Sequence, residues 1–129
     1  MQINEAYLEQ IKLLPNAAQL LTSMIQETEE IEQRTGLYSV CWSSGIDCRE
    51  YLKFFIEKAL IESFENCIEI FSIVDGMEQP VDQGSLTEAV QLLENGINEM
   101  QENISPFYSD EKKKFLNELL TLLHTFFNK

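Results

Sequence analysis

Three cysteines and one histidine are the residues of this sequence best suited to metal binding or nucleophilic catalysis. Cys41 and Cys48 are separated by six residues, Cys67 follows within an apolar run, and the single histidine is His124. Structural zinc sites usually pair cysteines about two to four residues apart. A cysteine nucleophile needs a neighbouring base to form its thiolate. The sequence therefore predicts free thiols, with no metal centre, no cofactor and no catalytic cysteine.

Carboxylates far outnumber every other charged group. The chain has 22 Asp and Glu residues against 9 Lys and Arg, and no Lys or Arg occurs between Lys58 and Lys112. Like charges accumulate here instead of pairing with cations along each helix. We interpret them as a negative surface that steers a basic partner; an acidic surface with no binding role is the alternative. The candidate partner-binding acids are Glu27, Glu29, Glu30, Glu32, Asp47, Asp75, Glu78 and Asp82.

Two aromatic residues join these candidates. Tyr38 and Trp42 stand in a segment rich in serine and glycine, and we expect residues 35–46 to form a loop. Aromatic side chains on a polar loop are typical anchors of protein interfaces. Burial in the core is the alternative.

The elements that position these residues are predicted to be helices. Apolar residues recur at helical spacing through most of the chain, and no good strand pattern appears. We expect an all-α, single-domain bundle of about five helices, residues 1–129, around a long central helix at about 48–74. An Asp47–Glu50 capping pair begins that helix, and Ser85 with Glu88 begins the next. The predicted core includes Leu60, Phe64, Phe71, Val90, Leu93, Ile97, Leu119 and Phe126.

Composition limits the class of partner. The hydrophobic fraction of 44% argues for a folded core, and the net charge of −13 repels nucleic acid and anionic lipid. The first ten residues lack the basic and apolar regions of a signal peptide, and no apolar run reaches the roughly 20 residues of a membrane span. We therefore expect a cytoplasmic protein that binds neither nucleic acid nor membranes.

One segment carries a resemblance to a known group of proteins. The stretch FENCIEIFSIVDGMEQPVD, residues 64–82, resembles the long helix ending in an Ile/Val-Asp-Gly turn of several small acidic helical proteins. These are bacterial immunity proteins of contact-dependent inhibition and other polymorphic toxin systems. The resemblance implies tight binding to a cognate toxin, often a basic nuclease, and assigns no functional residue.

The resulting hypothesis is a non-enzymatic immunity protein, or antitoxin. It would bind a cognate basic toxin domain of nuclease type and block its active site or substrate-binding surface. An acidic nucleic-acid mimic that inhibits a defence enzyme, and a secretion chaperone or adaptor, are the alternatives. We expect no enzymatic activity, because the sequence offers no convergent set of nucleophile, base and electrophile.

Overall fold

The computed structural model describes residues 5–78, 80–102 and 110–128. Throughout these ranges the chain is helical and contains no strand, so the prediction of an all-α fold is confirmed. The described ranges contain seven α-helices and two 3-10 turns in place of the five predicted helices. They are α1 (Glu5–Ile11), α2 (Ala17–Glu27), α3 (Ile31–Ser43), η1 (Arg49–Tyr51), α4 (Leu52–Ile61), α5 (Phe64–Asp75), α6 (Gln83–Glu102), α7 (Asp110–Thr125) and η2 (Phe126–Asn128).

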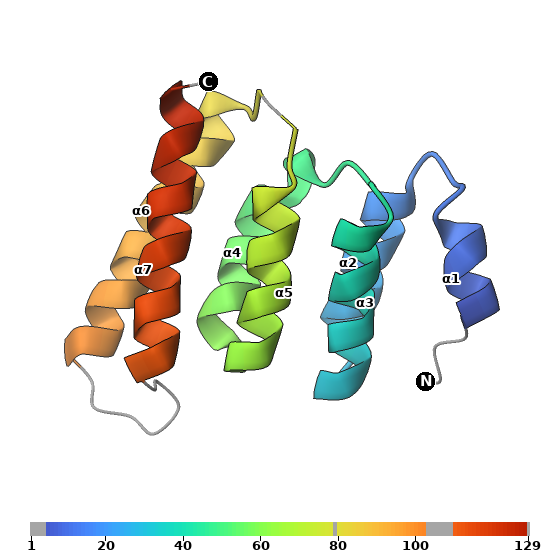
Figure 1. Cartoon of the computed structure of the whole chain (residues 1–129), viewed down its shortest axis with the longest axis horizontal. Helices are drawn as coiled ribbons and strands as arrows, with labels where there is room; N and C mark the ends of the chain where they lie inside the picture. Colours follow the sequence, from blue (N-terminus) through green and yellow to red (C-terminus); the bar gives the residue numbers. More distant parts are fainter. Residues whose placement is uncertain (1–4, 79, 103–109, 129) are drawn as a thin grey trace.

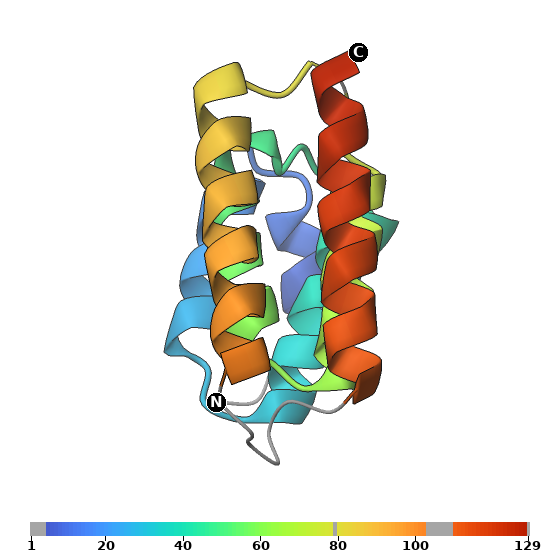
Figure 2. The same cartoon turned by 90° about the vertical axis from the view of Figure 1, so that its left-hand side faces the viewer.

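The helices form a stack of three antiparallel pairs, α2–α3, α4–α5 and α6–α7, arranged in two layers (Figure 1). Helices α3, α5 and α7 make one layer, and α2, α4 and α6 lie behind them. Figure 2 shows α6 and α7 side by side at one end of the stack. The short α1 lies at the opposite end and packs against α2. Each pair thus buries one face against the next pair.

The prediction of one central helix at 48–74 is wrong, because the helix is interrupted at Glu62 and Ser63. Glu62 ends α4 with an extended backbone (ψ 165°), and Ser63 begins α5. The Ser63 hydroxyl accepts a hydrogen bond from the Asn66 backbone N–H at 3.4 Å, which caps the first turn of α5. The segment therefore folds back on itself as an antiparallel pair.

The predicted loop at 35–46 is wrong for most of its length, since α3 continues to Ser43. Leu37, Tyr38 and Cys41 share its buried face, and this burial outweighs the helix-weakening effect of Gly36.

Both predicted capping pairs are also replaced by other contacts. Asp47 accepts from the backbone N–H of Arg49, two residues on, at 3.1 Å. Asp82 caps α6 by accepting from the Ser85 N–H at 2.9 Å. The Ser105-Pro106 pair predicts the end of the helix that Ser85 was expected to begin, but both residues lie outside the described part of the chain.

The core runs continuously through the stack. Of the predicted core residues, Val90, Leu93, Ile97, Leu119 and Phe126 are buried, whereas Leu60, Phe64 and Phe71 are half-buried. Gly96 lets α6 approach α4 closely, since a Cβ there would lie 2.8 Å from Leu60 Cδ1. None of the helices described is both long and apolar enough to cross a membrane.

Candidate functional site

The candidate acids separate into two groups near the opposite ends of α3. Glu27, Glu29, Glu30 and Glu32 surround the α2–α3 connection, where α3 begins. The second group, which we call the Trp42 end, consists of Trp42, Asp47, Asp75, Glu78 and Asp82. It lies where α3 ends and where α5 connects to α6, at the top of Figure 1. With 13 residues, α3 separates the groups by about 20 Å.

Trp42 is the most prominent side chain of the Trp42 end. It is 46% exposed, and its indole N–H donates to the carboxylate of Glu69 on α5. This hydrogen bond joins the indole ring on α3 to α5. A hollow of about 150 Å³ beside the ring is also lined by Asp47 and Glu78. The structure thus brings together three of the predicted site residues.

Asp47 has a structural role within this group. Its Oδ2 accepts from Arg49 Nη2 at 2.8 Å, and Arg49 Nη1 also donates to the carbonyl of Pro80 at 3.2 Å. The hydrogen bonds from the Arg49 side chain and backbone hold the pKa of Asp47 below its usual value. The pair ties the α3–α4 connection to the α5–α6 connection. Asp75 and Glu78 remain exposed carboxylates, and Glu78 lines the hollow beside Trp42.

Tyr38 does not belong to this surface, and its predicted role as an exposed anchor is wrong. The side chain is fully buried, and its hydroxyl donates to Glu62 Oε2 at 2.6 Å. Arg34 donates two hydrogen bonds of 2.8 Å to the same carboxylate, from Nε and Nη2. Tyr38 follows Arg34 by one helical turn, so both side chains reach the α4–α5 break.

This buried network stabilises the connections between helices. Lys112 on α7 donates to the carbonyls of Leu60 at 3.0 Å and Glu62 at 2.6 Å, which α4 leaves unpaired at its end. Burial opposes ionisation of Glu62, but the hydrogen bonds from Arg34 and Tyr38 outweigh it and hold its pKa below the usual value. With Glu62 only 4% exposed, a substrate has no access to this carboxylate.

The cysteines are free and buried. The hydrogen bond between the Cys41 and Cys48 thiols, together with burial, raises the pKa of Cys41. Burial also raises the pKa of Cys67 to about 11, and its thiol donates to the Ala59 carbonyl at 3.1 Å. His124 is exposed on α7, next to Glu94. Among the residues described, no three His, Cys, Asp or Glu side chains cluster as metal ligands.

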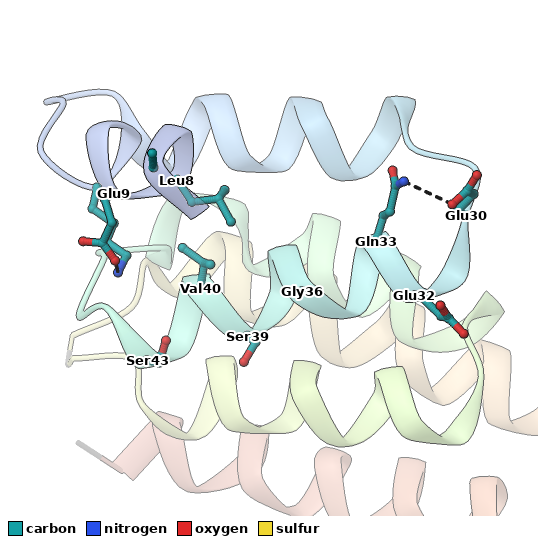
Figure 3. A pocket seen from close by; sticks show the side chains of 11 residues that line it. Leu8, Glu9, Glu30, Glu32, Gln33, Gly36, Ser39, Val40 and Ser43 are labelled. Carbon is teal, nitrogen blue, oxygen red and sulfur yellow. Dashed lines mark hydrogen bonds and ion pairs between the residues drawn. The ribbon is translucent and has the colours of Figure 1, made fainter. Parts of the chain in front are cut away.

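A groove of about 900 Å³ runs between α1 and α3. Sequence reasoning missed it, because residues 35–46 of its α3 side were predicted to be loop. Figure 3 shows Leu8 of α1 beside Val40 of α3, with Gly36 and Gln33 further along α3. Glu30 accepts a hydrogen bond from Gln33 Nε2 at 3.1 Å, and the other acids of the rim are Glu9 and Glu32. The available signal was the helical spacing of Gly36, Ser39, Val40 and Ser43.

No family model matches this chain, and no match was found among curated proteins or solved structures.

Proposed function

We propose that this chain is a non-enzymatic immunity protein that binds a basic, nuclease-type toxin domain through the Trp42 end and blocks its substrate-binding surface. The observation that carries the proposal is the exposed Trp42, which is hydrogen-bonded to Glu69 and shares a hollow with the exposed carboxylate of Glu78. An aromatic ring beside anionic groups suits a cationic protein surface. The ring supplies contact area, and the carboxylates pair with Lys and Arg.

Electrostatics support a basic partner. The net charge is −13, and several Lys and Arg side chains bind groups within the chain itself. Arg34 binds Glu62, Arg49 binds Asp47, and Lys112 binds backbone carbonyls. The surface carboxylates therefore keep most of their negative field, which raises the rate of encounter with a cationic protein.

The placement of reactive groups supports a role in binding without catalysis. The thiols are buried, and the Glu62 carboxylate is enclosed by its own hydrogen-bond donors. The exposed ring of Trp42 and the acids beside it serve recognition, because binding requires only complementary shape and charge.

A growth-protection assay tests the proposal. The toxin for this assay is the protein domain recovered with this chain by pull-down and mass spectrometry from its native host. Co-expression of the wild-type chain should restore growth, and the purified chain should inhibit the toxin's nuclease activity at one-to-one stoichiometry.

Two variants locate the binding surface. Trp42→Ala should lose protection, whereas Tyr7→Ala should retain it. Tyr7 is a matched control because it is 51% exposed and lies on α1, which contributes no residue to the hollow beside Trp42. Failure of the wild-type chain to protect would reject the function, and full protection by Trp42→Ala would reject the proposed surface.

A further inference from the structure

Besides Gly84 in the first turn of α6, the described helices contain two interior glycines, Gly36 and Gly96, and only Gly96 has an explanation inside the described structure. Glycine weakens a helix interior relative to alanine, so each position calls for a reason. Gly96 allows α6 to pack on Leu60 of α4. Gly36 lies within α3, yet a Cβ built there meets no atom within 4 Å. The close approach that a helical glycine permits is therefore unused at Gly36.

Gly36 faces the groove between α1 and α3. Helices α3, α5 and α7 follow one another in the front layer, and the groove lies at the α3 edge of this layer (Figure 1). Within the described part of the chain, this edge is covered by α1, which has 7 residues against the 13 of α3. Leu8 and Val40 give the groove an apolar floor, and Gly36 continues that floor without a side chain (Figure 3).

The rim of the groove is acidic. Glu9, Glu30 and Glu32 line it together with a single cation, Lys12. Lys12 is already paired, since its Nζ lies 2.7 Å from Glu9 Oε1. Glu30 and Glu32 stand near the start of α3. An occupant of the groove therefore meets net negative charge along its sides.

From these features we infer that the groove binds a helix of a partner protein, with small and apolar residues along one face and Lys or Arg on both sides of that face. The whole length of α3, about 20 Å, corresponds to about four turns of a helix. Gly36 lets the backbone of the incoming helix approach α3 closely, while the basic side chains pair with the rim. The groove lies apart from the hollow beside Trp42, so the inference does not depend on the proposed function.

Selection from a displayed library of helical peptides tests this inference. The library holds peptides of about 16 residues, with randomised positions on every face, and the bait is the wild-type chain. Enriched peptides should carry a small and apolar face flanked by Lys and Arg. Their affinities are then measured by fluorescence anisotropy.

Gly36→Phe fills the groove from an exposed position with open space around it, so circular dichroism should show a folded protein. It should weaken binding of the enriched peptides at least 10-fold, and Glu30→Lys with Glu32→Lys should weaken it similarly. Trp42→Ala should leave peptide affinity unchanged, which separates this surface from that of the proposed function. Gly36→Ala, measured beside Gly36→Phe, should have the smaller effect on binding because it adds only a methyl group.

Three outcomes would overturn the inference: no enrichment, enriched peptides that are not basic, or equal affinity for the Gly36→Phe variant. A fourth is self-association of the wild-type chain in analytical ultracentrifugation that Gly36→Phe abolishes, because the groove would then be a contact between copies.

Discussion

Replacing Glu62 by glutamine should destabilise the fold strongly, because this carboxylate holds the α4–α5 break in place. Glu62 is 4% exposed and accepts from Arg34 and Tyr38. Removing one partner of a buried ion pair typically costs about 3–5 kcal/mol, because the remaining charge loses its partner. Arg34 keeps its hydrogen bonds to the carbonyls of Thr28 and Glu29, so we expect the lower end, about 3 kcal/mol.

Urea denaturation followed by far-ultraviolet circular dichroism measures this loss. With a slope near 2 kcal/mol/M, the midpoint should fall by about 1.5 M while the slope stays unchanged. Asp47→Asn is the matched control. It removes the same kind of charge opposite Arg49, but that pair is exposed, and exposed pairs contribute little to stability. A Glu62→Gln midpoint equal to that of the wild type, or equal to that of Asp47→Asn, would refute the reasoning.

Three further predictions concern pH, the glycines and the core. The pKa of Glu62 lies below its usual value of 4.5, so its contribution is present above that pH and is lost as pH falls through the lower folded-state pKa. Denaturation at a series of pH values should therefore show that the difference in free energy of unfolding between the wild type and Glu62→Gln becomes smaller in acid. Gly36→Ala should raise the free energy of unfolding by about 0.5–1 kcal/mol, whereas Gly96→Ala should lower it, because its new methyl group collides with α4; thermal melts distinguish the two. Phe55→Ala should cost about 3–5 kcal/mol and more than Phe64→Ala, since Phe55 is fully buried and Phe64 half-buried; paired urea titrations measure the difference.

The helical class of this fold could be predicted from local periodicity, but the break at Glu62 and Ser63 could not. Apolar residues continue on both sides of Ser63, so the pattern resembles one uninterrupted helix. The groups that stabilise the break are distant in sequence: Arg34 precedes Glu62 by 28 residues, and Lys112 follows it by 50. Tertiary contacts of this kind override local propensity, and local periodicity carries no record of them.

The candidate site was predictable in its charge but not in its grouping. The excess of acids is visible in the composition. The separation of Glu27, at the end of α2, from Asp75, at the end of α5, depends on the direction of each helix in the fold. Tyr38 and Gly36 were misplaced for a related reason. Glycine and serine suggested a loop, and the burial of Leu37 and Tyr38 that makes this segment helical appears only once α5 packs beside α3.

Stopped-flow association with the purified toxin domain, across a salt series, tests the central claim most directly. The Debye length falls from about 30 Å at 0.01 M salt to about 8 Å at 0.15 M, so the association rate of the wild-type chain should fall steeply. Reversing Asp75 and Glu78 to lysine should slow association at low salt. The same charge change at Glu27 and Glu29, at the α2–α3 connection, should slow association less.

Trp42→Ala should instead act on dissociation. Loss of a central anchor costs about 2 kcal/mol, which corresponds to a dissociation rate raised about 30-fold. Two results together would contradict binding of a basic toxin at the Trp42 end: an association rate that does not depend on salt concentration in any variant, and an unchanged dissociation rate in Trp42→Ala.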